Sequence, residues 1–263
     1  MSQSKRTLLQ LTECTIRFGG LTAVSALNFE IGGEELVGLI GPNGAGKTTV
    51  FNVITGVYQP TAGDIRFSGQ SLVGRKPFQI TADGIARTFQ NIRLFDSLSV
   101  ADNVRVAFHR HVKSGIARSL WRGKVFHEEE KRIAGEVMDL LLMFHLEKFH
   151  DAPAKSLSYG DQRRLEIVRA LATRPKLLLL DEPAAGMNAS EKLELMNLIR
   201  FIKDKYKIAV LLVEHDMQVV MGICERIAVL DYGEKIAEGP PAEVRRNPKV
   251  IEAYLGDELK IKN

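Results

Sequence analysis

The chain has 263 residues, of which 45% are hydrophobic and 26% charged, a composition that is typical of a globular protein and excludes a disordered one. The net charge is +4, but the 36 basic and 32 acidic residues are mixed along the sequence, so we expect no nucleic-acid partner. The two cysteines lack metal-ligand spacing, and no apolar stretch follows the charged N-terminus. These features favour a reduced, cytoplasmic setting and predict no secretory signal.

Short β-branched runs alternate with helical patterns, which is typical of an α/β fold with a largely parallel sheet. Strands are predicted at Leu8–Phe18, Leu27–Ile31, Glu35–Ile40, Asp64–Phe67, Leu177–Leu180, Ile208–Val213 and Arg226–Leu230. Further along, helical spacing dominates, and one stripe of a packed core helix is formed by Val137, Leu140, Leu141 and Phe144. We therefore expect a single domain over 1–263, with an α/β core from 1–90 and 174–263 and an inserted helical subdomain over about 91–173.

A basic run from Arg105 to Arg122 is the nearest approach to a charged patch. Anionic lipid headgroups and a solvated helix-loop segment explain it equally well. His109 and His111 are two residues apart and do not share a helix face, so we expect them at the surface. The longest apolar blocks, residues 177–180 and 208–213, are far too short to span a bilayer, so any membrane span must come from another chain.

A phosphate-binding loop is predicted between residues 41 and 48, which fit G-x-x-x-x-G-K-[ST] after an apolar strand and before a helix. Its glycines let the backbone N–H groups turn inward, and the helix N-terminus adds positive potential. Lys47 is expected to reach the β- and γ-phosphates of ATP, Thr48 to ligate Mg²⁺, and Thr49 to donate to the α-phosphate. The predicted ATP-binding residues here are Gly41, Pro42, Asn43, Gly44, Ala45, Gly46, Lys47, Thr48 and Thr49.

Two carboxylates, Asp181 and Glu182, end an apolar strand, the position where ligands bind in open α/β sheets. Asp181 is predicted to hold Mg²⁺ through water. Glu182 precedes Pro183, which favours an extended backbone, and is predicted to act as the general base for an attacking water. His215 follows a second strand and either senses the γ-phosphate or is a satisfied structural histidine.

The segment Leu157-Ser158-Tyr159-Gly160-Asp161 precedes a helix with an apolar stripe, and Ser158 and Asp161 are spaced as a capping box. Between the phosphate loop upstream and the Asp-Glu strand downstream, this segment resembles the LSGGQ signature of the ABC ATPase family. It departs from that pattern at Tyr159 and Asp161. Because a carboxylate would repel a phosphate, we predict that Asp161 caps its own helix.

The resemblance implies a P-loop NTPase (RecA-like) core with an antiparallel β-subdomain and an inserted α-helical subdomain. It also implies a head-to-tail dimer, in which Ser158 and Gly160 contact the ATP of the opposite subunit. Gln90 matches the Q-loop glutamine, expected to sense Mg²⁺ and the membrane partner, and Phe18 matches the aromatic that stacks on adenine. Residues 185–188 resemble the D-loop of the family. Asn188 replaces the aspartate of that loop, so the hydrogen bonds that the aspartate makes between subunits are not carried over.

The phrases IRFGGLTAV, ARTFQNIRLF, LSYGDQRRLEI and DEPAAGMN resemble one subgroup, the larger ATPase subunit of the branched-chain amino acid importer. This resemblance implies a peripheral protein at the cytoplasmic face of the inner membrane, using ATP and Mg²⁺. The implied partners are permease subunits, a second ATPase subunit in a favoured heterodimer and, indirectly, an external solute-binding protein. A permease helix would dock beside Gln90, contacting Asn91 to Asp96. The rivals are a urea or amide importer, a lipopolysaccharide exporter, and a soluble ABC ATPase of iron–sulfur assembly.

Overall fold

The computed structural model describes residues 7–108 and 124–260. His109, His111 and most of the basic run from Arg105 to Arg122 lie outside the described residues, so the interpretations of that run stay predictions.

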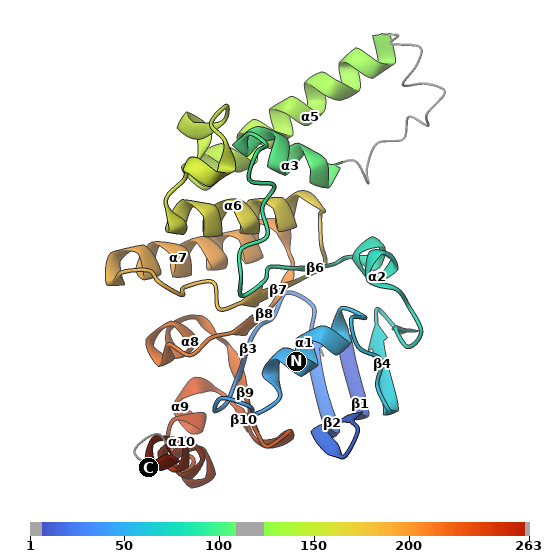
Figure 1. Ribbon diagram of the computed structural model, residues 1–263, viewed down its shortest axis with the longest axis vertical. Coiled ribbons are helices and arrows are strands. Elements are labelled where there is room, and N and C mark those ends of the chain that lie inside the picture. Colours follow the sequence, from blue (N-terminus) through green and yellow to red (C-terminus); the bar gives the residue numbers. More distant parts are fainter. Residues whose placement is uncertain (1–6, 109–123, 261–263) are drawn as a thin grey trace, which may run out of the picture.

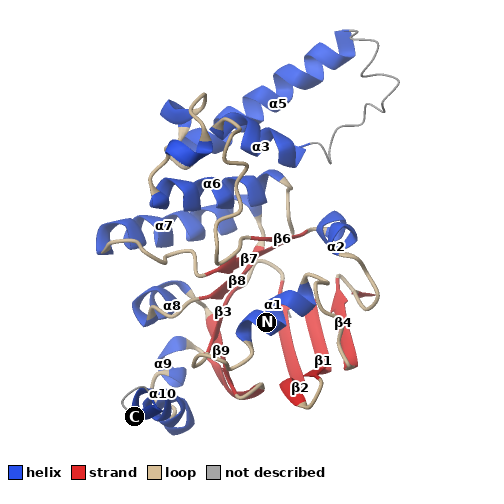
Figure 2. Cartoon of the chain, in the orientation of Figure 1, coloured by secondary structure: helices blue, strands red, loops and turns tan. Residues whose placement is uncertain are grey.

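Two sheets form the frame of the molecule (Figures 1 and 2). The first is antiparallel, in the order β2-β1-β4-β5, and contains β1 (Thr7–Phe18), β2 (Leu21–Gly32), β4 (Ala62–Phe67) and β5 (Gln70–Ser71). The second, in the order β10-β9-β3-β8-β7-β6, is parallel except for its edge strand β10. Its strands are β3 (Leu36–Ile40), β6 (Ile85–Arg87), β7 (Leu177–Asp181), β8 (Ala209–Val213), β9 (Arg226–Asp231) and β10 (Glu234–Gly239).

Each predicted strand is confirmed, although β2 begins six residues earlier than its prediction, at Leu21 instead of Leu27. The sequence patterns missed β5, β6 and β10. The first two have only two and three residues, too few to show a period. The third is a half-exposed edge strand with three charged residues, so it lacks the apolar run of the buried strands.

Helices cover both faces of the parallel sheet and extend the molecule beyond it. They are α1 (Lys47–Ile54), α2 (Pro77–Asp83), α3 (Val100–Phe108), α5 (Lys124–Met143), α6 (Tyr159–Ala172), α7 (Ala189–Tyr206), α8 (Met217–Ile223), α9 (Pro241–Val244) and α10 (Pro248–Lys260), with 3₁₀ turns at Glu147–Phe149 and Ala154–Ser156. Figure 1 places α3 and α5 at one end and the antiparallel sheet towards the other. Among the described residues, no helix is both long and apolar enough to cross a membrane.

The parallel sheet separates two hydrophobic cores. Because side chains alternate along a strand, Leu178 and Leu180 of β7 enter the core under α6 and α7, whereas Leu177 and Leu179 enter the core shared with α1 and the antiparallel sheet. This explains the continuous apolar run of that strand. The predicted helical stripe is confirmed, since its four residues are buried on α5 and just beyond it, in the first core.

Candidate active site

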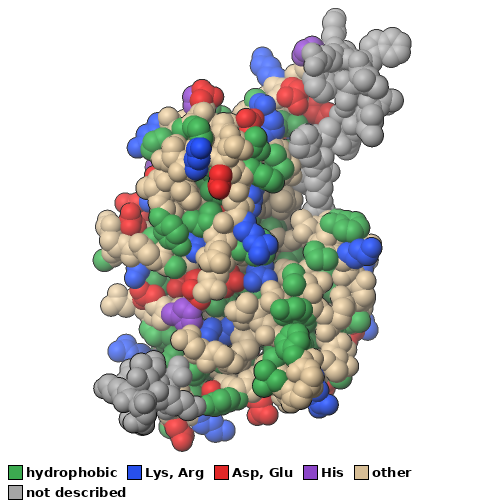
Figure 3. Space-filling view, in the orientation of Figure 1, with side chains coloured by type: hydrophobic (Ala, Val, Ile, Leu, Met, Phe, Trp, Pro, Cys, Tyr) green, Lys and Arg blue, Asp and Glu red, His purple; other side chains and the backbone are tan. Residues whose placement is uncertain are grey.

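Polar residues of widely separated segments meet at one edge of the parallel sheet. The strands β3, β8, β7 and β6 are neighbours in this order and run in the same direction, so their carboxyl ends lie together. The phosphate loop follows β3, His215 follows β8, Glu182 follows β7, and Gln90 follows β6. Figure 3 shows acidic, basic and histidine side chains gathered at mid-height of the molecule.

The phosphate loop passes too close to neighbouring backbone for any residue other than glycine at two positions. A Cβ atom at Gly41 would lie 2.1 Å from the carbonyl oxygen of Leu230, and one at Gly46 would lie 2.6 Å from that of Ala23. The loop is also joined to the turn between β9 and β10, where Gly233 donates its N–H to the Ala45 carbonyl oxygen (3.0 Å). The same Gly233 accepts a hydrogen bond from the Ser25 N–H of β2 (2.9 Å).

Lys47 is buried at the start of α1 and lies inside the curve of the loop. Its ammonium group donates to the carbonyl oxygens of Gly41 (2.7 Å) and Pro42 (2.8 Å). The positive charge is therefore fixed beside the backbone N–H groups of the helix N-terminus, an arrangement that favours an anionic ligand.

Two of the predicted catalytic side chains, those of His215 and Gln90, contact the third, Glu182. The Glu182 carboxylate lies 2.5 Å from His215 Nε2 through one oxygen and accepts a 3.2 Å hydrogen bond from the Gln90 amide through the other. An arrangement of this kind can hold a water molecule and accept its proton.

The predicted extended backbone at Glu182 is wrong, because its φ is +50°, in the left-handed region. Two hydrogen bonds explain this conformation. The Glu182 N–H continues the ladder to the Val213 carbonyl oxygen (2.8 Å), and its own carbonyl then accepts from the Ala185 N–H (3.2 Å) in a tight turn. The chain must reverse at once after the strand, and this requirement outweighs the preference imposed by Pro183.

A cavity of about 420 Å³ opens beside these groups. Of the predicted residues, it is lined by Phe18, Asn43, Gly44, Ala45, Gly46, Lys47, Thr48, Thr49, Gln90, Glu182 and His215. The lining does not include Gly41, Pro42, Ser158, Gly160 or Asp181. The sequence did not single out Tyr232 of the β9–β10 turn, which also lines it and is 70% exposed.

Phe18 lies at the rim of the cavity, 44% exposed, with its ring 5.0 Å from that of Tyr58 in an edge-to-face pair. A half-exposed aromatic that is fixed by a second ring presents a face on which a planar base can stack.

Asp181 is almost fully buried and forms an ion pair with Arg87, with 2.8 Å between the guanidinium and one carboxylate oxygen. Arg87 also donates to the Asn52 side-chain oxygen of α1 (2.7 Å), so it joins the strand of Asp181 to the helix of the phosphate loop. Arg87 was not predicted as a site residue, because an arginine in a three-residue strand carries no sequence signal of this pairing.

Oxygen donors that suit Mg²⁺ are present at this edge of the sheet. Thr48 brings a hydroxyl and Gln90 an amide oxygen to the cavity wall, and Asp181 immediately precedes Glu182 in the chain. Hydroxyl, amide and carboxylate oxygens are the ligands that this hard cation prefers.

The signature segment lies at the N-terminus of α6. Ser158 is the N-cap, and its hydroxyl accepts from the Asp161 N–H (3.2 Å) and donates to the Asp161 carboxylate (2.8 Å). Asp161 therefore binds within the N-terminus of its own helix, but the N-cap is Ser158, and the Asp161 carboxylate accepts from the Ser158 hydroxyl instead of from a backbone N–H. Asn188 has a similar local role, since it forms a reciprocal capping box with Glu191 at the start of α7.

Comparison with known families agrees with this geometry. Residues 24–185 match the family model described as "ABC transporter". The chain belongs to the ABC transporter ATPase family. Residues 234–260 match a second model, "Branched-chain amino acid ATP-binding cassette transporter". The fold is thus that of a P-loop ATPase cassette, as the resemblance predicted.

Two relatives and one solved structure illustrate the similarity. The high-affinity branched-chain amino acid transport ATP-binding protein BraF of Pseudomonas aeruginosa is 44% identical over 96% of this chain and 99% of its own length. Its counterpart LivG of Escherichia coli is 45% identical over 95% and 98%. An ATP-binding cassette of an ABC transporter, solved in its ADP conformation, superimposes with a TM-score of 0.81 at 29% identity, over 95% of this chain and 99% of the other.

Proposed function

We propose that this ABC ATPase is the motor subunit of an importer for branched-chain amino acids, at the cytoplasmic face of the membrane. The observation that carries the proposal is the convergence of the phosphate loop with Gln90, Glu182 and His215 around one cavity. The match of residues 234–260 to the branched-chain model supports the solute class, because that segment lies outside the part that fits the general family.

In this proposal the chain's own residues divide the work. Lys47 and the loop amides hold the phosphates of ATP, and Phe18 stacks on the adenine. Glu182 accepts the proton of the attacking water while Gln90 and His215 orient its carboxylate. Thr48, Gln90 and, through water, Asp181 would hold Mg²⁺, which neutralises phosphate charge when bound.

Ser158 and Gly160 do not line the cavity of their own chain but lie at the half-exposed N-terminus of another helix. This placement supports a head-to-tail dimer, in which each signature meets the ATP of the opposite subunit. We favour a heterodimer with a second, similar ATPase. Residues 91–173 would act as the helical subdomain, and residues 1–90 and 174–263 as the core.

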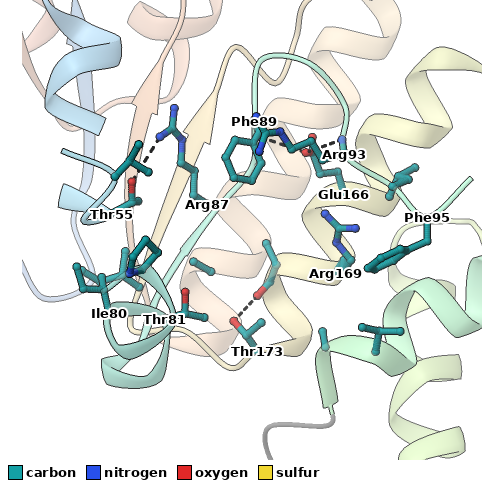
Figure 4. Close-up of a pocket in the computed structure, with 18 residues that line it drawn as sticks. Thr55, Ile80, Thr81, Arg87, Phe89, Arg93, Phe95, Glu166, Arg169 and Thr173 are labelled. Atoms are coloured by element: carbon teal, nitrogen blue, oxygen red, sulfur yellow. Dashed lines mark hydrogen bonds between the residues drawn. The ribbon is translucent and has the colours of Figure 1, made fainter. Parts of the chain in front are cut away.

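A second cavity, of about 670 Å³, is the proposed docking groove for a permease helix (Figure 4). It lies between α2, the loop after β6, α3 and α6, and its walls include Arg93, Leu94 and Phe95 from the segment 91–96. Phe95 is 48% exposed and Arg169 lies across its ring, so the groove offers apolar surface beside fixed positive charge.

The first test is to purify the tagged chain from gently solubilised membranes and to identify its companions by mass. Two integral membrane proteins and a second ATPase are expected. The complex is then reconstituted in liposomes, and its ATPase rate is measured with binding protein loaded with leucine, isoleucine or valine. Stimulation by an amide instead would indicate the urea or amide importer. Co-purification with a lipid would indicate the lipopolysaccharide exporter, and a soluble partner would indicate the ATPase of iron–sulfur assembly.

The second test places the permease. The variant Phe95→Cys is expected to crosslink to a membrane protein through its new thiol, because residue 95 lines the groove. The matched control is Phe201→Cys on α7, which is 50% exposed and does not line the groove. Equal crosslinking from both positions, or none from Phe95→Cys, would contradict this docking site.

A further inference from the structure

Two side chains of α6, one turn apart, hold the backbone of the loop that follows β6. Arg163 donates to the carbonyl oxygens of Phe89 (2.6 Å) and Gln90, and Glu166 accepts from the N–H groups of Phe89 (3.2 Å) and Arg93 (3.4 Å). Figure 4 shows Glu166 reaching Phe89 and Arg93. Arg163 and Glu166 are each only 2% exposed and form an ion pair at 3.4 Å.

The hydrogen bonds from Arg163 hold the backbone of Gln90. Its carbonyl is bound by Arg163, while its side-chain amide reaches the Glu182 carboxylate at 3.2 Å. A buried charged pair with several hydrogen bonds to one peptide segment holds that segment more rigidly than a surface contact does.

Tyr159, where this chain departs from the general signature, belongs to the same network of hydrogen bonds. The Tyr159 hydroxyl accepts a hydrogen bond from Arg163 at 2.9 Å, and the guanidinium lies 5.3 Å from the centre of the tyrosine ring. The ring in turn packs on Gly186 of the D-loop, where a Cβ atom would lie 3.2 Å from it. A tyrosine in place of the usual glycine thus joins the signature to two other loops.

We propose that Tyr159, Arg163 and Glu166 are positioning residues, which tie Gln90 and the D-loop to the helix that carries the signature. The inference rests on the proposed ATPase function and deepens it. Because Ser158 and Gly160 flank Tyr159, any displacement of α6 when it meets the opposite subunit is passed to Gln90 in its own chain.

The test compares single variants of the purified transporter complex. Arg163→Met should lower kcat by about 10-fold or more, because small misplacements of catalytic groups are costly, while the KM for ATP changes less than about twofold. The hydrogen bonds given above for Arg163 and Glu166 run to the loop after β6 and to Tyr159, and not to the phosphate loop, which is proposed to bind ATP. Tyr159→Phe removes only the hydroxyl and should lower kcat less. The matched control is Arg164→Met, the next residue, whose partner Glu194 is 62% exposed on α7.

Melting temperatures are measured for each variant, and Arg163→Lys, which keeps the charge but not the fork of donors, replaces Arg163→Met if the latter unfolds. A kcat equal to that of Arg164→Met would overturn the inference. So would a rise in KM that matches the fall in kcat, since that pattern indicates a general structural role. A wild-type complex without ATPase activity would contradict the proposed function instead.

Discussion

The cavity beside the phosphate loop and the proposed docking groove both border the loop after β6, and they are built in different ways. Much of the cavity wall comes from a single run of sequence, residues 43–49, completed by side chains at strand ends. The groove draws its 18 lining residues from separate stretches between Thr55 and Thr173. Gln90 faces the cavity, whereas its neighbour Phe89 faces the groove. The comparison teaches that the phosphate loop is a local property of the chain, whereas the proposed catalytic side chains and the proposed docking groove come together only in the assembled fold.

The sharpest way to break the comparison is to remove the proposed base. Glu182→Gln should bind ATP and accumulate a closed dimer but hydrolyse ATP about 10²–10⁴-fold more slowly, because the amide cannot take a proton. Turnover is measured by phosphate release and binding by a fluorescent nucleotide. Co-purification with the permease should persist, since the groove does not include this residue. Wild-type turnover would remove Glu182 from its role.

Arg87 lines the groove and pairs with Asp181, which precedes the cavity residue Glu182 in the chain. Both side chains are at most 7% exposed, so Arg87→Met leaves a buried carboxylate without its partner and should reduce the free energy of unfolding by about 3–5 kcal/mol. Denaturant titration measures this loss.

The double variant Arg87→Met/Asp181→Asn should recover part of the lost stability, because it buries no unpaired charge. The control is Arg66→Met, whose pair with Asp64 is exposed and should contribute about 0–1 kcal/mol. Equal losses in Arg66→Met and Arg87→Met would contradict a buried, stabilising pair.

A smaller effect is expected from Asn188, the N-cap of α7, because its capping box stabilises that helix. Asn188→Ala removes the capping box of α7 and should destabilise the protein by about 1 kcal/mol, as measured by thermal unfolding. Asn188→Asp keeps the acceptor and should be neutral or slightly stabilising. If both variants have the stability of the wild type, the cap contributes nothing.

The smallest effect concerns the thiols, on which the crosslinking comparison depends. Burial raises the pKa of Cys14 to about 11 and that of Cys224 to about 12. At pH 8 the reactive thiolate of Cys14 would be only about one part in a thousand. Native protein should therefore resist iodoacetamide until the pH approaches those values, and unfolded protein should react at once. Rapid labelling of the native form would contradict this expectation, because the native cysteines would then contribute to the crosslinking that is assigned to Phe95→Cys.

The sequence predicted the parts of the fold that follow from short-range patterns. The fully buried strands β3, β7 and β8 were evident as apolar runs, and the phosphate loop from its glycines and Lys47. The bond between Ser158 and Asp161 at the start of α6 followed from their three-residue spacing.

Contacts between distant segments left no such pattern. Arg87 and Asp181 are 94 residues apart, and Arg163 is 73 residues from Gln90, so only the folded chain reveals that they meet. The backbone of Glu182 was mispredicted for the same reason, because its hydrogen bond to Val213 comes from another strand.

The hydrogen bonds that join Gly233 to the phosphate loop and to β2 use main-chain atoms alone. Such a joint does not depend on which side chains surround it, so substitutions in the following segment leave it intact as long as the glycine stays. The stretch that matches the branched-chain model begins at residue 234, directly after this joint. The segment that distinguishes the branched-chain model thus begins where the main-chain attachment of the phosphate loop ends.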